Sequence, residues 1–489
     1  MAEKEALSAQ TIKKKSVGGA MSYFVRTLLL NGLGLVSSLI LGGLLSKTEF
    51  AIYGVVTQII GILTFFSDIG LASALIQKKT EPTQEDYQTI FWTQMTLGTL
   101  IVLVCFGLVR GGFFANQLGA DGAGVLYALA FGFILATLKV VPSIKLTREL
   151  NFSKLVWPQI IEQVVYQGLL ITLVWNGMGV KAYTWAIWAR GIVGVVAMLY
   201  LVPFWPKLIF SKKSFINSFK YGFKFQLNDL LARIKDQLFY LFIASNWVQQ
   251  TFGVTTEQFG VISFAKNWSM YPYNLTVQNV MSITFPTFSR LQGNNHLIRR
   301  AIEKSIYFIT LAIFPILTGM CVFFWPLTQV VAHYNKWEDA LISFVFFTLA
   351  IAPAAISSPL TNVLNAIGKI NDTLKLMVLW TVLTWVLTIP LLNVWGFNAV
   401  AIASFIISLT SFLPVWMVKK YVDFSLWDQI WRQLTASLCM AAFGLFLMNF
   451  WTQSVTMLLV GMVSAGMIYV LVIALTGWKK LWSELRSLR

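Results

Sequence analysis

The sequence predicts an all-α polytopic membrane protein with about fourteen transmembrane helices. Of its 489 residues, 57% are apolar and only 12% are charged, whereas soluble domains carry roughly 25% charged residues. The mean hydropathy is +0.70. Apolar runs of about 20 residues, long enough to cross a bilayer, recur along the whole chain. This composition excludes a soluble globular enzyme.

The expected spans follow one another through short polar loops. Their approximate bounds are 20–45, 50–77, 87–109, 122–144, 155–175, 182–204, 219–245, 257–286, 304–326, 340–367, 374–392, 397–418, 430–450 and 454–476. The first span is too long for the apolar core of a signal peptide, so we expect it to be retained. The loops are far too short for a folded catalytic domain. No GxxxxGK[ST] phosphate loop is present, so we do not expect ATP hydrolysis or a catalytic residue.

Metal and cofactor sites are not expected either. The three cysteines, Cys105, Cys321 and Cys439, lie inside apolar runs, and the only histidines are His296 and His333. These cysteines and histidines are too few ligands for a zinc, haem or iron–sulfur site. The small number of cysteines and their position in apolar runs exclude a disulfide framework. The net charge of +17 is assigned to loop orientation rather than to a nucleic-acid partner.

Basic residues predict the orientation of the chain. With the N-terminus inside, 26 Lys and Arg fall in inner segments and four outside, namely Lys47, Arg110, Lys181 and Lys336. Cytoplasmic loops are the ones enriched in Lys and Arg. The sequence therefore predicts that both termini lie in the cytoplasm.

Two pairs of similar segments indicate an internal repeat. Ser46–Phe50 precedes the second span, and Thr255–Phe259 precedes the eighth. Gly179–Ala186 opens the sixth span, and Gly396–Ala403 opens the twelfth. Six helices per repeat give both copies the same orientation, so we expect two parallel six-helix bundles. The expected domains are 1–215 and 216–422 for the bundles, and 423–489 for two additional helices with a basic cytoplasmic tail.

Polar residues within the spans are the candidate functional residues. A charge at the centre of a membrane helix costs roughly 2.5 to 3.5 kcal/mol, so it normally faces a wet cavity or a partner. The expected cationic, substrate-binding cavity consists of Arg26, Arg190, Arg233, Lys235 and Lys266. Its expected polar lining consists of Asn31, Asn267, Asn274 and Asn362. The candidates for ion coupling are Asp68, Glu162, Asp229 and Asp236.

Structural explanations remain open for several of these residues. Lys139, near the end of its span, is interpreted as snorkelling towards the membrane surface. Asp229 and Arg233 have the spacing of an intrahelical ion pair. Glu162 lies among glutamines and could serve interhelical hydrogen bonding. Asp68 could cap a helix end.

Three stretches resemble a known family. They are Ser67–Gln77 (SDIGLASALIQ), Phe285–Gln292 (FPTFSRLQ) and Asn365–Asp372 (NAIGKIND). They are similar to the polysaccharide transporters of the multidrug/oligosaccharidyl-lipid/polysaccharide exporter superfamily, most of all to Wzx-type oligosaccharide flippases such as colanic acid exporters. The similarity extends over about residues 15–475.

This resemblance implies a V-shaped pair of six-helix bundles in the bacterial inner membrane. Such a protein flips undecaprenyl-pyrophosphate-linked oligosaccharide to the outer leaflet, driven by an ion gradient, for O-antigen, capsule or exopolysaccharide synthesis. The cationic cavity residues of the family would fall, by helix, on Arg26 and Lys266. Expected partners are the lipid-linked substrate, membrane lipids, and polysaccharide polymerases or glycosyltransferases.

Two other functions remain open from the sequence. A multidrug exporter of the same superfamily would place acids in its cavity to bind organic cations, whereas the first span has Arg26 and no acid. A membrane glycosyltransferase or polymerase would need acid–base residues in a sizeable external loop. The largest external loops, at 110–121 and 332–340, are short.

Overall fold

The part of the chain that the structure describes is almost entirely helical, as the apolar runs predict. The computed structural model describes residues 27, 29–67, 71–78, 80–149, 151–216, 219, 232–291 and 293–486. Each expected span meets a helix within these residues, and eight helical stretches there are long and apolar enough to cross a membrane. The chain divides into two compact units, Met1–Gln249 and Gln250–Arg489.

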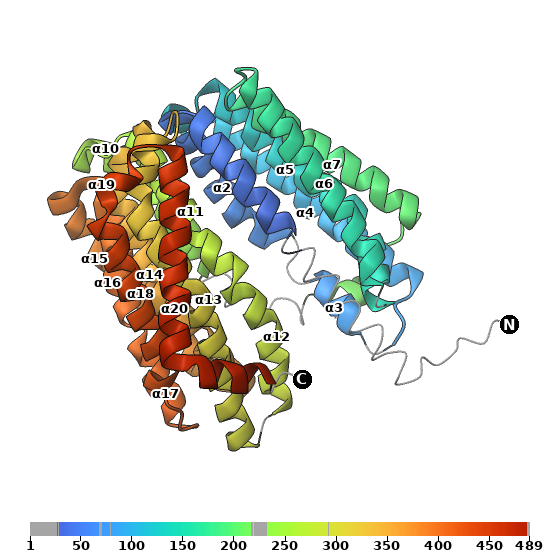
Figure 1. The fold of residues 1–489 in the computed structure, drawn as a ribbon. Helices are drawn as coiled ribbons and strands as arrows, with labels where there is room; N and C mark the ends of the chain where they lie inside the picture. The colour runs from blue at the N-terminus through green and yellow to red at the C-terminus, as the bar shows by residue number, and fades with distance from the viewer. Residues whose placement is uncertain are drawn as a thin grey trace. The chain divides into compact units, whose positions relative to one another are not determined.

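The first unit is a helical bundle built around α5. After an apolar helix at Leu29–Leu44, its elements are α2 Lys47–Ser67, α3 Leu71–Gln77, α4 Gln84–Arg110, α5 Ala115–Arg148, α6 Phe152–Trp175, α7 Lys181–Leu201, η1 Ile234–Leu238 and α9 Phe239–Ile243. Helix α10, Asn246–Phe252, includes the boundary between the two units at Gln249. Helix α5 contacts α2, α4 and α7, while α6 packs along α7 (Figure 1). The short elements η1 and α9 contact α2, so they belong to this unit.

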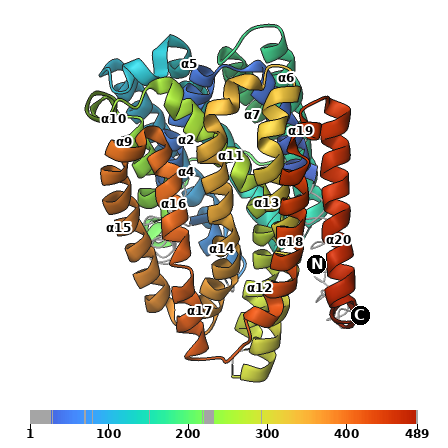
Figure 2. The same cartoon turned by 60° about the vertical axis from the view of Figure 1, so that its left-hand side comes forward.

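The second unit is centred on two long helices, α13 and α14. Its elements are α11 Thr256–Leu275, α12 Val277–Arg290, α13 Asn295–Val330, η2 Asn335–Ala340, α14 Leu341–Ala366, α15 Ile370–Trp395, η3 Gly396–Asn398, α16 Ala399–Leu409, α17 Phe412–Lys419, α18 Trp427–Phe446, α19 Met448–Trp451 and α20 Val455–Arg486. Helix α14 contacts α11, α13 and α16. Helices α13, α18 and α20 pack against one another (Figure 2).

Two helical stretches differ in extent from the expected spans, and local chemistry explains both differences. Helix α13 begins at Asn295, earlier than the apolar span expected from residue 304. The first turns carry charged residues, so hydropathy does not reveal them. Asn294 caps the helix there by accepting a hydrogen bond from the Leu297 amide at 3.1 Å. The expected span 397–418 is broken between α16 and α17. Pro414 has no N–H to donate to the carbonyl four residues earlier, which favours this break.

The paired segments that indicated a repeat adopt matching local structures. Ser46 and Glu49 bond reciprocally at the start of α2: the Ser46 amide donates to the Glu49 carboxylate at 2.7 Å, and the Glu49 amide donates to Ser46 Oγ at 3.2 Å. Thr255 and Gln258 form the same capping box at α11. Gly179 and Gly396 each have a φ of 53°, a conformation that favours glycine. The expected repeat boundary near residue 215 and the V-shaped arrangement remain predictions.

Arg148, at the end of α5, fixes the loop between α3 and α4. Its Nη1 donates to the carbonyl oxygens of Leu75, Ile76 and Lys78 at 2.7, 3.1 and 3.0 Å. Its Nη2 donates to the Thr80 carbonyl at 3.3 Å. One guanidinium therefore satisfies carbonyl groups that the end of α3 leaves without helical partners.

Candidate functional site

A buried carboxylate lies between two cations inside the first unit. Glu162, on α6, is 7% exposed. Lys139 Nζ, on α5, lies 2.6 Å from Glu162 Oε1, and Arg190 Nε, on α7, lies 3.7 Å from Glu162 Oε2. Three helices thus each contribute one charged group. We call these three residues the Glu162 cluster.

The interpretation of Lys139 as a snorkelling residue was wrong. Its side chain is only 18% exposed, and its ammonium donates to Glu162 at 2.6 Å. An ammonium in an apolar bundle needs either water or a counter-charge, because an unpaired buried charge is strongly unfavourable. A carboxylate on the next helix supplies the counter-charge, so the lysine has no need to reach the membrane surface.

Helix periodicity places Arg190 on the inner side of its helix. Tyr183 and Gly194, seven residues before it and four after, are buried. Trp185, Ile192 and Val196, on the opposite side, are exposed and suit contact with lipid. The Arg190 side chain is nevertheless 48% exposed. Arg190 is therefore placed on the bundle side of α7, and about half of its side chain stays accessible.

A glycine and a tyrosine shape the surroundings of the cluster. A Cβ atom added at Gly194 would lie 2.0 Å from Glu162 Oε1, so only glycine leaves room for the carboxylate. Tyr166, one turn after Glu162 on α6, lies under the Arg190 guanidinium, which is 5.6 Å from the ring centroid. With two cations and one anion, the cluster carries one surplus positive charge.

A second group of the expected candidate residues lies at the start of η1 and within it, next to α2. Arg233 Nη1 donates to the carbonyl oxygen of Gly61, and Lys235 Nζ lies 2.8 Å from Asp236 Oδ1. A regular α-helix was expected here, but Ile234–Leu238 is a π-helix. The i→i+5 hydrogen bonds of a π-helix change the spacing of side chains along the helix, and π-helical turns are frequent at functional sites.

The remaining expected residues are spread over other helices. Lys266, Asn267 and Asn274 lie on α11, with Asn267 exposed and the other two half-buried. Asn362 on α14 and Asn31 on the helix Leu29–Leu44 are also half-buried. Their role as cavity lining stays a prediction. Arg26, Asp68 and Asp229 lie outside the described residues.

The sequence predicted Glu162 as an ion-coupling residue and Arg190 as a substrate-binding residue, but it did not predict that they contact each other. Neither cation of the cluster lies three or four residues from the carboxylate, so a search along one helix finds no pair. The available signal was weaker: three charged residues, each alone on an otherwise apolar span. Gly194 and Tyr166 carried no sequence signal that distinguished them from packing residues.

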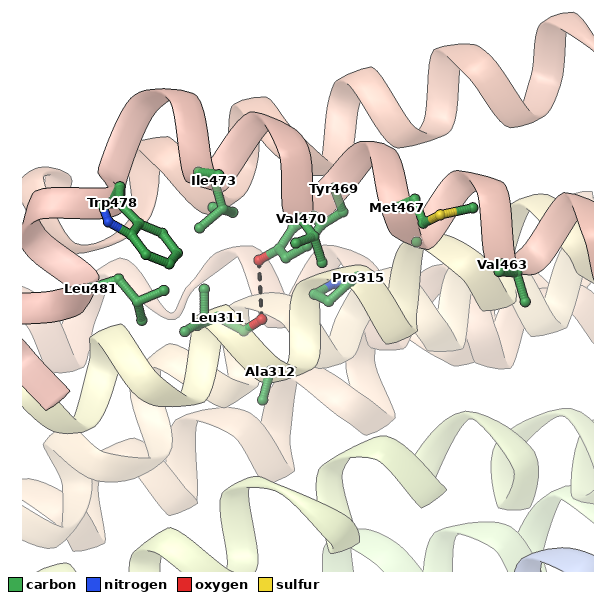
Figure 3. Close-up of a pocket in the computed structure, with 12 residues that line it drawn as sticks. Leu311, Ala312, Pro315, Val463, Met467, Tyr469, Val470, Ile473, Trp478 and Leu481 are labelled. Carbon is green, nitrogen blue, oxygen red and sulfur yellow. Dashed lines mark hydrogen bonds between the residues drawn. The ribbon is translucent and has the colours of Figure 1, made fainter.

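An apolar groove that the sequence did not predict lies between α13 and α20 of the second unit. It encloses about 680 Å³, and Leu311, Pro315, Met467 and Trp478 are among its lining residues (Figure 3). Tyr469 Oη donates to the Leu311 carbonyl at 3.0 Å and holds the two helices together. The groove contains no charged lining residue among those described, so it suits apolar contacts only.

Metal ligands do not gather in the described part of the chain. No group of three or more His, Cys, Asp or Glu side chains there could hold a metal ion. Cys105, Cys321 and Cys439 are unpaired with one another. The Glu162 cluster itself contains an ammonium, a guanidinium and a carboxylate group.

Comparison with known proteins places the chain in a family. The model of a family described as polysaccharide biosynthesis protein matches residues 40–342. Lipopolysaccharide biosynthesis protein WzxC of Escherichia coli K12 is 22% identical over 388 residues, which cover 76% of this chain and 74% of WzxC.

Two solved structures have the same fold. Lipid II flippase MurJ, in an inward closed conformation, matches with a TM-score of 0.69 and 13% identity, over 94% of this chain and 99% of MurJ. The MATE multidrug transporter DinF-BH matches with a TM-score of 0.59 and 14% identity, over 88% of this chain and 99% of that chain. Because the family model covers more than half of the sequence, this chain belongs to the family of polysaccharide biosynthesis proteins.

Proposed function

We propose that the protein is a flippase that moves undecaprenyl-pyrophosphate-linked oligosaccharide from the cytoplasmic to the outer leaflet of the bacterial inner membrane. The family match and the relative WzxC support a role in surface polysaccharide biosynthesis. The fold is shared by a flippase and by a multidrug transporter, so it does not choose between them. The charges of the Glu162 cluster in the first unit favour the flippase over the multidrug transporter.

The surplus cation of the Glu162 cluster carries this proposal. A lipid-linked sugar can leave its polyprenyl tail in lipid, but its pyrophosphate must cross a region where unpaired charge costs several kcal/mol. Arg190 offers a planar guanidinium that suits bidentate binding of phosphate oxygens. An organic cation, the substrate of a multidrug pump, would instead be repelled by the net positive cluster.

Alternating access is the simplest mechanism for such a protein. No covalent step is needed, because the substrate is only relocated. Glu162 and Asp236, with Asp68 and Asp229, are the proposed carriers of a coupling proton or sodium ion. We also propose that both termini face the cytoplasm, from the distribution of basic residues, and that polymerases or glycosyltransferases of the same glycan act alongside.

A reconstituted transport assay tests this function. The purified protein would be placed in vesicles with fluorescent undecaprenyl-pyrophosphate-linked oligosaccharide from the strain that carries the chain. We expect appearance of the label in the opposite leaflet, and Arg190→Gln should slow it about tenfold or more, because a charged hydrogen bond contributes roughly 1.5 to 3 kcal/mol. Lys181→Gln, at the exposed start of the same helix α7, is the matched control and should leave the rate unchanged.

A second assay addresses the rival function. The protein would be expressed in a host that lacks its own drug pumps, and resistance to cationic dyes would be measured. We expect no protection. Strong protection, together with no movement of the lipid-linked sugar in vesicles, would overturn the flippase proposal in favour of a multidrug exporter.

A further inference from the structure

We propose that Glu162 is a built-in competitor of the substrate at Arg190. In the empty protein the carboxylate acts as the counter-ion of the guanidinium. A phosphate of the head group then takes this place on Arg190, while Lys139 keeps Glu162 paired. The identity of the phosphate ligand rests on the proposed function, but the exchange at Arg190 is a separate claim with its own measurement.

The two contacts of the carboxylate are unequal. Lys139 Nζ lies 2.6 Å from it, the length of a strong charge-assisted hydrogen bond. Arg190 Nε lies 3.7 Å away, beyond hydrogen-bond length, so this contact is electrostatic only. Glu162 is therefore firmly held by Lys139 and loosely by Arg190.

The two cations also differ in how accessible their side chains are. The Lys139 side chain is 18% exposed and the Arg190 side chain 48%. The contacts of Arg190 within the described residues are the loose ion pair and the ring of Tyr166. A guanidinium has five N–H donors, and none of those on Arg190 makes a hydrogen bond to a described residue. Arg190 is thus the more accessible of the two cations, and its N–H groups can donate hydrogen bonds to a ligand.

Two cations make the exchange possible without leaving a buried charge alone. If Arg190 were the only partner of Glu162, an incoming phosphate would leave the carboxylate unpaired, which is strongly unfavourable. With Lys139 present, a neutral pair remains behind. The negative carboxylate still opposes the bound phosphate, so it weakens binding and favours release, as a carrier requires.

Binding measurements on four variants test this exchange. The probe is farnesyl pyrophosphate in detergent solution at fixed salt, with affinity measured by titration calorimetry on the full-length protein. We expect Glu162→Gln to bind roughly fivefold more tightly or better, because the competing charge is gone. Arg190→Gln should lose binding, and Lys181→Gln should match the wild type.

A double variant separates competition from net charge and from folding. Lys139→Met with Glu162→Gln keeps the single surplus charge of the wild type, removes the competitor and leaves no unpaired lysine. We expect it to bind the probe more tightly than the wild type as well. If Glu162 only positions Arg190, both variants will bind more weakly or unchanged, and the proposal is overturned. Absence of wild-type binding to the probe overturns it too.

The outcome is distinguishable from failure of the flippase function. Tighter binding by both variants, combined with no transport by the wild type in vesicles, would support the exchange and refute the proposed function. Normal transport by the wild type, combined with weaker binding by both variants, would refute the exchange alone.

Discussion

Helices α5, α6 and α7 of the first unit and helices α14, α15 and α16 of the second are packed in the same pairwise pattern but hold different chemistry. In each set the third helix contacts both others. The first set is joined by the charged Glu162 cluster. In the second, Ser343 on α14 donates a neutral hydrogen bond from its Oγ, at 2.8 Å, to Oδ1 of Asn398, the last residue of η3 and the one directly before α16. Residues 376–418 contain no Asp, Glu, Lys or Arg.

This difference bears on the expected repeat, which remains a prediction. The capping boxes at Ser46 and Thr255 and the glycines at 179 and 396 match, because they determine where helices start and turn. The interior charges do not match, because an apolar or neutral contact packs helices equally well. Of these two sets of three helices, only the first is joined by a cluster of charged groups among the described residues.

The largest expected effect comes from removing the carboxylate. Glu162→Ala leaves Lys139 buried without a counter-charge and should lower the free energy of unfolding by about 3 kcal/mol or more. Adding Lys139→Ala should recover part of this loss. Thermal unfolding in detergent measures both.

The matched control for that prediction is another ion pair between α5 and α7. Asp121 on α5 and Lys181 on α7 form an exposed pair at 3.5 Å. Asp121→Ala should change stability by less than about 1 kcal/mol, as is usual for surface pairs. Equal losses for Glu162→Ala and Asp121→Ala would show that the cluster is not buried as described.

A smaller effect is expected from filling the space beside the carboxylate. Gly194→Ala places a methyl group where a Cβ would lie 2.0 Å from Glu162 Oε1, so we expect a loss of about 1 to 3 kcal/mol. Gly168→Ala on α6 is the control, since no atom lies within 4 Å of its Cβ position. It should be neutral or slightly stabilising. Similar melting temperatures for the two variants would contradict this account of Gly194.

The neutral bonds of the second unit should matter for stability only. Ser343 is fully buried, and Ser343→Ala leaves Asn398 without its donor, which should cost about 1 to 2 kcal/mol. Pyrophosphate binding should be unchanged, because no charge is altered. A change in binding as large as that of Arg190→Gln would remove the contrast between the two units.

The smallest effects test the repeat itself. Ser46→Ala and Thr255→Ala each remove a capping side chain, and each should lower stability by about 1 kcal/mol. Both losses, read from denaturant titrations, should agree closely because the two caps share one geometry. A clear loss at one position and none at the other would argue that the two segments are not equivalent.

Much of the fold was predictable, whereas the site was predictable only in part. Apolar runs gave the helices because every membrane-spanning backbone must satisfy its own hydrogen bonds. The cost of buried charge singled out Glu162 and Arg190 as candidates. Their partner Lys139 could not be assigned, because pairing across helices depends on how α5, α6 and α7 are rotated. The π-helix at Ile234–Leu238 was missed for a similar reason: no residue type specifies the extra residue in its turn.

Arg148 shows that a basic residue near a helix end can be structural rather than topological. It counts among the cations that predict which loops remain inside, yet its terminal nitrogens are occupied by carbonyl oxygens of residues 75–80. A lysine would keep the charge but lose the planar fork that reaches several acceptors at once. A replacement that keeps only the positive charge at position 148 therefore does not keep the hydrogen bonds, because these depend on the shape of the guanidinium.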